Sequence, residues 1–313
     1  MLKVGLVGVG GITRAHIPAW ERMEDVDLVA LCDVRPELME HYTSQRKYTC
    51  LDEMLEKEEL DILDICLPTH LHVDVAIKAM KMGVHVVCEK PVSLNREDVM
   101  RLYQTARENN VRFMVAQVLR FFPEYEFVKE VYESKKYGKL LSGYMSRLSQ
   151  CPGWSWENWM KKEEESGMVP FDLHIHDLDF MVYAFGVPQK VNSFRAQTPV
   201  QDALTAVYSF DGFYITSEAS WYAAEYPFCA GFRFQFENAV VEWDGNLKVY
   251  EINNGQTQSA ASAEGENCVV QLPKTDAYYS ELRYFVDCVK NDCDTDKIKA
   301  SELEAVIDIL HSI

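Results

Sequence analysis

The first 118 or so residues alternate between short apolar runs and amphipathic stretches, and this alternation constrains the fold more than any other feature. Aliphatic and β-branched runs predict strands at residues 3–7, 27–32, 62–66, 84–88 and 112–116. Helical spacing of apolar residues predicts helices at 12–23, 36–46, 51–57, 71–82 and 96–109. A strand–helix–strand succession builds a parallel sheet covered by helices on both faces. We therefore expect an α/β domain with a doubly wound Rossmann sheet over residues 1–118.

The remainder, residues 119–313, has a different pattern, with helices expected at 122–133 and 172–184 and then a series of strands. The predicted strands are 139–148, 190–196, 203–210, 214–222, 231–237, 240–243 and 247–252. Asp211-Gly212 and Asp244-Gly245 indicate hairpin turns. The stretch 253–267 is expected to be a loop, and helices at 277–289 and 301–311 are candidates for packing back on the first domain. This predicts a second, α+β domain with a mainly antiparallel sheet.

Charge and composition narrow the class of protein. The net charge is −18, which disfavours binding to the phosphate backbone of nucleic acids. No apolar run approaches the roughly 18 residues of a membrane helix, so we expect no membrane partner. The nine cysteines include no CxxC pair and several lie in apolar strands, which favours buried, reduced thiols. These observations predict a cytoplasmic protein without a metal site.

A glycine-rich turn joins the first predicted strand to the first helix. Gly8 allows a tight turn, Gly10 permits close approach of a pyrophosphate, and a helix opening near Gly11 and Ile12 offers free N–H groups to it. Thr13 stands where the dinucleotide-binding pattern has Gly or Ala, so the match is imperfect. By itself, such a turn after a strand is equally compatible with a simple connection.

Asp33 ends the second predicted strand and strengthens the interpretation of a dinucleotide site. A carboxylate at this place accepts hydrogen bonds from the adenosine ribose hydroxyls and repels a 2′-phosphate, which favours NAD over NADP. Arg35, two residues later, softens that preference. The alternative for Asp33 is a carboxylate that only caps the strand end.

Glu89-Lys90-Pro91 follows a later strand of the same predicted sheet. Ligands of such sheets bind at the carboxyl ends of the strands. Lys90 would therefore stand where the nicotinamide ring arrives, and a partly desolvated ammonium there can pass protons. The alternative is a surface lysine in a turn.

The segment DLHIHD in the second domain places Asp172 and His176 four residues apart, on one face of a helix, with Asp179 three further on. A carboxylate one turn away orients an imidazole and raises its basicity, which suits a group that takes the proton of an alcohol. Two alternatives stay open. Asp172, His174 and His176 could hold a metal ion, or the histidines could form a structural network.

Four segments together resemble the Gfo/Idh/MocA family, whose members include glucose–fructose oxidoreductase and inositol 2-dehydrogenase. They are, in order, GLVGVGGITRAH, PTHLHVDVAIKAMKMGVHVVCEKPVSLN, QVLRFFP and DLHIHDLD, and the resemblance extends from residue 1 to the final helices. It implies a Rossmann domain followed by an α/β domain with an open-faced sheet that often forms subunit contacts.

The resemblance also implies roles for single residues. Thr69 and His72 would lie along the cofactor, Glu89 near the nicotinamide ribose, and Lys90 would be the catalytic lysine. The D-x-x-x-H arrangement of inositol dehydrogenase-like members corresponds to Asp172 and His176.

Two departures from the family pattern affect the expected pocket. His174 replaces a common glycine, and Met168-Val169 replaces a pair of small residues. Arg120 and Trp159 are further candidates for lining the substrate pocket, and each is equally compatible with a packing role.

The sequence thus predicts a dehydrogenase or reductase that uses NAD, or less readily NADP, on a sugar, cyclitol or polyol. Lys90, Asp172 and His176 are the expected catalytic residues, with the same three and Arg120 contacting substrate. An uncovered sheet face predicts a homodimer or homotetramer. Two rivals are a glycosidase that uses bound NAD transiently and a regulator that senses cofactor or sugar without turnover.

Overall fold

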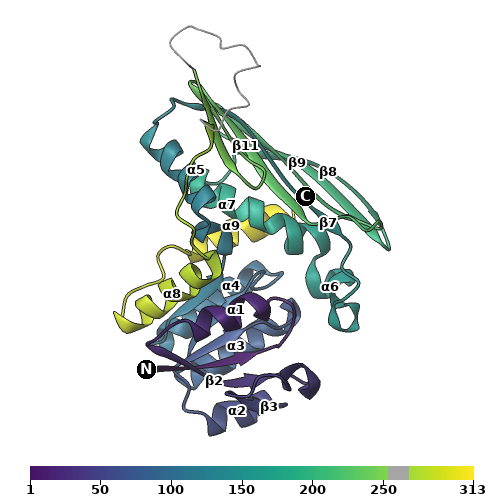
Figure 1. Cartoon of the computed structure of the whole chain (residues 1–313). Coiled ribbons are helices and arrows are strands. Elements are labelled where there is room, and N and C mark those ends of the chain that lie inside the picture. Colours follow the sequence, from purple (N-terminus) through teal and green to yellow (C-terminus); the bar gives the residue numbers. More distant parts are fainter. Residues whose placement is uncertain (253–267) are drawn as a thin grey trace. The chain divides into compact units, whose positions relative to one another are not determined.

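The computed structural model describes residues 1–252 and 268–313, so the loop expected at 253–267 lies outside the described residues. The chain divides into two compact units, which are described separately (Figure 1). The first unit comprises Met1–Phe121, Glu164–Ser166 and Thr275–Ile307. The second comprises Phe122–Glu163, Gly167–Lys274 and Asp308–Ile313.

The first unit contains a six-stranded sheet in the order β3-β2-β1-β4-β5-β6, and every strand pair is parallel. Its strands are β1 (Leu2–Val7), β2 (Val26–Cys32), β3 (Arg46–Tyr48), β4 (Ile62–Ile65), β5 (His85–Glu89) and β6 (Phe113–Ala116). All residues of β4 and β6 are buried, as expected for strands covered on both faces. The predicted Rossmann-type α/β fold is confirmed.

The helices of this sheet are α1 (Thr13–Glu21), α2 (Leu51–Lys57), α3 (His72–Lys81) and α4 (Arg96–Glu108). One predicted helix, at 36–46, is wrong. Only Pro36–Met39 form a short 3-10 turn, and the chain then enters β3, which pairs with β2. Met39 is the single buried apolar side chain between residues 36 and 46, so no apolar stripe exists to hold a helix against the sheet.

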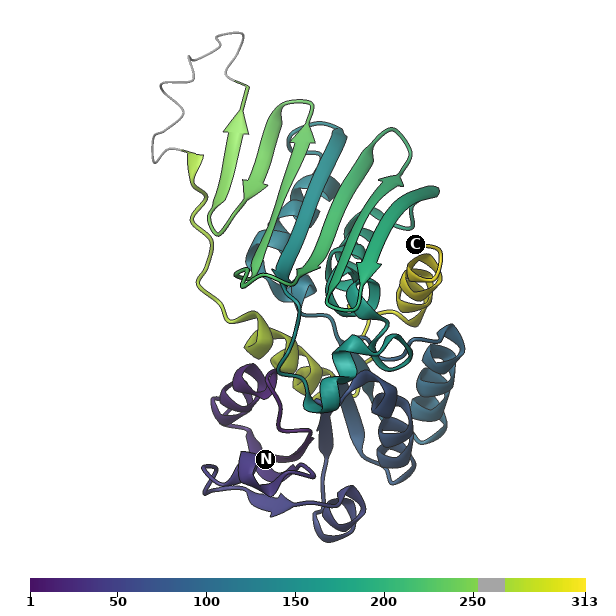
Figure 2. The same cartoon turned by 90° about the vertical axis from the view of Figure 1, so that its right-hand side faces the viewer.

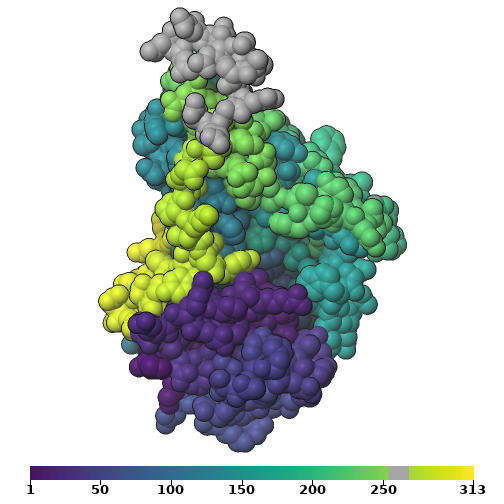
Figure 3. Space-filling view, viewed as in Figure 1, coloured from purple at the N-terminus to yellow at the C-terminus, as the bar shows by residue number. Residues whose placement is uncertain are grey.

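A late segment of the chain completes the first unit. Helix α8 (Ala277–Lys290) packs against α1, and Figure 3 shows the yellow C-terminal residues against the purple N-terminal ones. The Asp276 side chain caps α8 by accepting hydrogen bonds from the N–H groups of Tyr278 and Tyr279. Arg283 donates to Asp25 Oδ1 at 2.6 Å, which ties the helix to the loop before β2.

The second unit contains a seven-stranded sheet in the order β13-β12-β11-β7-β10-β9-β8 (Figure 2). The strands are β7 (Leu140–Gln150), β8 (Lys190–Thr198), β9 (Gln201–Ser209), β10 (Tyr214–Tyr222), β11 (Cys229–Phe236), β12 (Ala239–Trp243) and β13 (Leu247–Glu251). Only β7 and β10 pair in parallel, so the predicted mainly antiparallel sheet is confirmed. Gly212 and Gly245, with φ of +85° and +111°, form the two expected turns.

Helices α5 (Pro123–Ser134) and α7 (Ile175–Phe185) lie behind this sheet as it is seen in Figure 2. Buried and exposed residues alternate along β9 and β11, so one face of the sheet packs inward and the other faces out. The residues of α6 (Glu163–Ser166) and α9 (Ala300–Leu310) are divided between the two units. No helix of the described residues is long and apolar enough to span a membrane.

Candidate functional site

The parallel sheet brings several predicted site residues to one edge. Gly8 follows β1, Asp33 follows β2, Thr69 comes shortly after β4, and Lys90 follows β5. Because all strands run in one direction, their carboxyl ends meet at the same edge. The strand order also reverses beside β1, between β1 and β4, which is where ligands of doubly wound sheets bind.

The glycine turn has different requirements at its two key positions. Gly8 has a φ of +90°, and a Cβ there would stand 2.6 Å from the carbonyl oxygen of Cys66, so only glycine fits. A Cβ on Gly10 would meet nothing within 4 Å, which leaves open space above the turn. Thr13, the departure from the usual pattern, closes the turn because its hydroxyl donates to the carbonyl of Gly10 at 2.7 Å.

Helix α1 begins at Thr13, preceded by Ile12, and no side chain caps its first turn. The N-terminal end of a helix presents unpaired N–H groups and a positive partial charge. Gly10 and Gly11 before it are exposed. Open space, uncapped N–H groups and exposed glycines together fit the pyrophosphate of a dinucleotide.

The Asp33 carboxylate belongs to a network of its own. The carboxylate is nearly buried and accepts a hydrogen bond from the N–H of Val9 at 2.8 Å, which fixes β2 to the glycine turn. Arg35 pairs with the same carboxylate, with Nε 3.0 Å from Oδ1 and a terminal nitrogen 3.2 Å from Oδ2. The guanidinium expected to soften the cofactor preference therefore lies directly on the residue expected to set it.

The lysine turn is held from two sides. The N–H of Lys90 donates to the Glu89 carboxylate at 3.1 Å, and the Lys90–Pro91 peptide is cis. On the other side, the ring nitrogens of His72 lie 2.9 Å from the carbonyl oxygen of Pro91 and 2.7 Å from that of Leu67. Lys90 itself is half-buried.

His72 does not have the surroundings that the resemblance implied. The side chain is 1% exposed and both of its ring nitrogens face main-chain carbonyls, so the ring supports the turn and is not offered to a cofactor. Burial lowers the pKa of His72, against the two carbonyls, which raise it. A neutral ring can donate to only one of the two carbonyls.

Behind the lysine turn lies a buried polar cluster that the sequence analysis did not foresee. His16 places Nδ1 2.8 Å from Asp64 Oδ2 and Nε2 3.0 Å from Glu89 Oε1. Trp20 donates to the same Asp64 oxygen at 2.7 Å, and Cys66 Sγ lies 3.6 Å from His16 Nδ1. The one available signal was Asp64 itself, a charged residue inside an apolar strand, which requires a buried partner.

His16, Asp64 and Cys66 also form the one group, among residues 1–252 and 268–313, whose ligand atoms could surround a metal ion. These atoms lie within 4.8 Å of one another and all three residues are buried. Hydrogen bonds within the cluster and from Trp20 already engage them. The cluster therefore accounts for its own buried polar groups.

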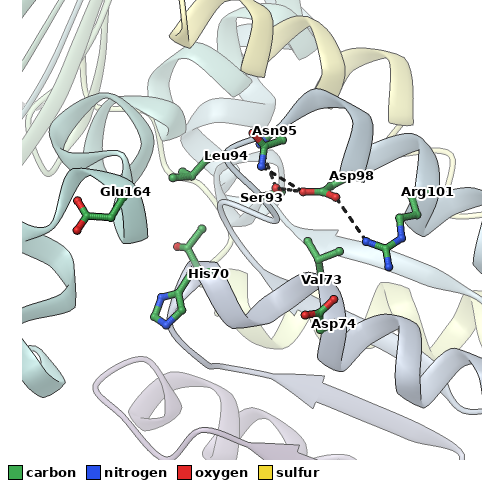
Figure 4. A pocket seen from close by; sticks show the side chains of 10 residues that line it. His70, Val73, Asp74, Ser93, Leu94, Asn95, Asp98, Arg101 and Glu164 are labelled. Carbon is green, nitrogen blue, oxygen red and sulfur yellow. Dashed lines mark hydrogen bonds and ion pairs between the residues drawn. The ribbon is translucent and has the colours of Figure 1, made fainter.

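A cavity of about 300 Å³ opens next to the lysine turn, between the starts of α3 and α4 (Figure 4). Its floor is polar, since Asp98 accepts hydrogen bonds from Ser93 at 2.6 Å and from Asn95 at 3.4 Å. The cavity is lined by Thr69, His70, Val73, Asp74, Ser93, Leu94, Asn95, Asp98, Arg101 and Glu164. Thr69 is thus the one predicted cofactor residue on its wall.

In the second unit, Asp172 and His176 stand out by their exposure. Every other residue from 166 to 182 is buried, whereas these two are partly accessible. Asp172 lies in a π-helical turn, Pro170–His174, that leads into α7. A four-residue step overshoots one turn of an α-helix, and the wider π turn reduces this overshoot. Asp172 and His176 therefore share one accessible stripe of the segment 166–182.

His174, which lies between them, points the other way. Its Nε2 is 2.5 Å from the hydroxyl of Tyr208 and its Nδ1 is 3.4 Å from that of Ser217. Burial, with a contribution from Arg147, lowers the pKa of His174 to about 3, so the ring is neutral. The structural-network alternative therefore describes His174, and the metal alternative fails because this ring faces away from Asp172 and His176.

Beneath the same helix, Arg147 donates to Asp177 at 2.8 Å and to the Tyr125 hydroxyl at 3.2 Å. All three side chains are buried. Sequence reasoning missed this pair, because alternation along β7 does not reveal an inward-facing arginine. The pair fixes α7 to β7 and α5, and so fixes the stripe that carries Asp172 and His176.

Two weaker candidates have structural roles. Arg120 was a candidate for contacting substrate, but its side chain is fully buried, 2.5 Å from the carboxylate of Glu302 and 2.7 Å from the carbonyl of Lys297. The expectation is wrong because the ion pair holds the segment after β6 to the first turn of α9, and no part of the guanidinium is accessible. Trp159 packs against an apolar cluster of the second unit.

Comparisons with known proteins agree with this geometry. Residues 2–117 match the Gfo/Idh/MocA model described as an oxidoreductase family with an NAD-binding Rossmann fold, and residues 125–239 match the C-terminal domain of that family. These two regions make up more than half of the chain.

Among curated relatives, 2,7-anhydro-N-acetylneuraminate hydratase of Escherichia coli is 29% identical over 201 residues, covering 61% of this chain and 52% of the relative. Myo-inositol 2-dehydrogenase of Thermotoga maritima is 28% identical over 190 residues, covering 59% and 55%. The matches thus span about half the length of these relatives. A solved levoglucosan dehydrogenase, in complex with NADH and levoglucosan, shares the fold with a TM-score of 0.83 at 18% identity, covering 100% of this chain and 96% of its own.

Proposed function

The chain belongs to the Gfo/Idh/MocA oxidoreductase family, and on that premise we propose that it transfers a hydride between a nicotinamide cofactor and a secondary alcohol or ketone of a sugar, cyclitol or polyol. The observation that carries the proposal is the isolation of Asp172 and His176. Between residues 166 and 182 every other residue is buried, and the two partly accessible ones are a carboxylate and an imidazole four positions apart.

Oxidation of a secondary alcohol removes a hydride from carbon and a proton from oxygen. Nicotinamide, when bound, accepts the hydride, and the protein must take the proton. We assign His176 as the base for that proton, since an imidazole exchanges protons near neutral pH. Asp172 orients the ring and accepts a hydrogen bond from a substrate hydroxyl, and Lys90 polarises the reacting oxygen or relays its proton.

The cofactor proposed is NAD, with NADP disfavoured. The glycine turn would hold the pyrophosphate through Gly8, Gly10, Gly11 and Ile12, and Asp33 would accept hydrogen bonds from the ribose. Arg35 on the Asp33 carboxylate works against strict selection of NAD over NADP, because a guanidinium is also the natural partner of a 2′-phosphate.

The test is a screen of sugars and inositols with NAD and with NADP, in which the absorbance of the reduced cofactor reports turnover. The Lys90→Ala and His176→Ala variants should each lose at least about a hundredfold in kcat/KM, the effect of removing an acid–base group. Exposed residues of the same types provide matched controls, Lys81→Ala and His41→Ala, which should keep the wild-type rate. Unchanged turnover in both site variants would refute the assignment.

A second candidate is a reaction without net oxidation, because one of the relatives reported above is named a hydratase. A glycosidase that uses NAD transiently belongs to the same class. Such an enzyme would convert its substrate with no net change in the absorbance of reduced cofactor, while the sugar product changes. A regulator that binds cofactor and sugar without converting either would give neither signal.

We also propose a cytoplasmic homodimer or homotetramer without nucleic-acid or membrane partners. What supports the assembly is the outward face of the seven-stranded sheet, where Phe194 is 78% exposed and Tyr214 is 51% exposed. Light scattering should show an oligomer for the wild type and a smaller species for Phe194→Glu, because the added charge would disrupt the interface. A monomeric wild type would contradict the proposal.

A further inference from the structure

The proposed reaction needs Lys90 at a fixed place, and the first unit holds a side chain that can provide this. His16 lies in the first turns of α1, the helix that begins at the glycine turn. Its ring spans the gap between two carboxylates, Asp64 in β4 and Glu89 at the end of β5. Glu89 in turn accepts the N–H of Lys90. Hydrogen bonds thus connect helix α1, which begins at the glycine turn, to the lysine turn.

We propose that His16 is a positioning residue, a cation held between Asp64 and Glu89 that fixes the Glu89 carboxylate and, through it, Lys90 relative to the glycine turn. The inference rests on the proposed function for its kinetic consequence, but the geometry stands without it.

The charge of His16 follows from its contacts. A neutral ring can donate from only one nitrogen, whereas both nitrogens of His16 face carboxylate oxygens, at 2.8 and 3.0 Å. Two buried carboxylates facing one imidazole require a cation between them. Burial by itself would lower the pKa of His16, but the contact with the Asp64 carboxylate outweighs burial and raises it well above the usual range.

The other groups around the ring do not compete for this role. Trp20 donates to Asp64 from the same helix, one turn further on, and thereby fixes the carboxylate that His16 contacts. Cys66 stands beside Nδ1, and burial keeps this thiol protonated by raising its pKa. From α8, the ring of Tyr278 lies 6.0 Å from that of His16. Asp64 and Glu89 are therefore the anionic partners.

The critical variant is His16→Gln, which is neutral and keeps one N–H donor for a single carboxylate. Its matched control is His85→Gln at the opposite end of β5, where the ring accepts the N–H of Arg112. Glu89→Gln removes the other end of the link, in case His16→Gln does not fold. Thermal melting establishes which variants are folded.

The first readout does not depend on turnover. It is the rate at which acetic anhydride modifies Lys90 in the cofactor-free protein, measured by peptide mass spectrometry with Lys81 as the internal reference. In His16→Gln the freed Glu89 carboxylate can pair with the ammonium, so the rate at Lys90 should fall about tenfold relative to Lys81, the equivalent of one charged hydrogen bond. In Glu89→Gln it should change by at least about threefold, and in His85→Gln it should not change. An unchanged Lys90 rate in folded His16→Gln overturns the proposal.

The second readout separates positioning from general damage. For whichever substrate the wild type turns over, kcat of His16→Gln should fall about tenfold or more while the Kd of NADH and KM change less than about threefold. A loss of NADH binding with kcat retained contradicts the positioning role. If the wild type converts no substrate, the proposed function fails, and the acetylation result still decides the role of His16.

Discussion

The two glycines of the dinucleotide turn provide a sharp test, because the structure gives them opposite reasons for being glycine. In Gly8→Ala, the new Cβ would stand 2.6 Å from the carbonyl oxygen and 2.7 Å from the carbonyl carbon of Cys66, at a φ of +90°. A non-glycine residue in such a conformation costs about 1–3 kcal/mol. Forcing an extra carbon into packed backbone costs a further 1–3 kcal/mol or so.

The free energy of unfolding of Gly8→Ala should therefore fall by about 2–6 kcal/mol, a large part of the roughly 5–15 kcal/mol of a typical domain. In Gly10→Ala the new Cβ meets nothing within 4 Å, so the stability should stay within about 0.5 kcal/mol of wild type. Its methyl group would instead occupy the space assigned to the pyrophosphate. The Kd of NADH should rise about tenfold to a hundredfold, the equivalent of 1–3 kcal/mol of overpacking.

Urea unfolding, monitored by tryptophan fluorescence, measures the change in the free energy of unfolding, since Trp20 is fully buried in the first unit. Fluorescence titration with NADH measures the change in its Kd. The reasoning is refuted if Gly8→Ala is as stable as wild type. It is equally refuted if Gly10→Ala is stable and binds NADH with the wild-type Kd.

Three further predictions concern single side chains. Arg120→Ala should lower the free energy of unfolding by about 3–5 kcal/mol, because it leaves Glu302 without its buried partner. The enzyme that remains folded should have the wild-type KM. A raised KM in a variant of wild-type stability would instead support a role of Arg120 in contacting substrate. Burial lowers the pKa of His174 to about 3, so the folded protein binds a proton at this ring less readily than the unfolded chain does. The contribution of the neutral ring to the free energy of unfolding is therefore fully present above about pH 6.5. Below that pH it falls by up to about 1.4 kcal/mol per pH unit. His174→Gln should flatten that decline in acid unfolding curves, and an unaltered slope would contradict the cause. Arg35→Ala should raise the preference for NADH over NADPH about tenfold in binding titrations, and an unchanged ratio would show that the guanidinium does not contact the cofactor.

Much of the fold could be read from the sequence because the strands of the first unit are buried on both faces. Such strands are continuous apolar runs, and glycine and proline punctuate them. The exception is β3, whose residues Arg46, Lys47 and Tyr48 carry no apolar signal and form a strand only because β2 offers an open edge. Pairing of this kind depends on the rest of the sheet and leaves no trace in local composition.

The positions of the candidate site residues could be predicted where they depend on the order of the strands. They could not be predicted where they depend on side-chain packing. Gly8, Asp33 and Lys90 follow strands, so the parallel sheet brings them to one edge. By contrast, the partners of His72 and Arg120 are a carbonyl and a carboxylate that come from distant segments, and no spacing reveals them.

The central claim is direct hydride transfer from a sugar carbon to nicotinamide, and isotope transfer tests it most directly. The best substrate of the screen, carrying deuterium at the carbon to be oxidised, is incubated with NAD, and the reduced cofactor is isolated for mass spectrometry and NMR. We predict that the deuterium is found at C4 of the nicotinamide ring. Deuterium that is released to water, or retained in the sugar product with no reduced cofactor formed, would contradict the account.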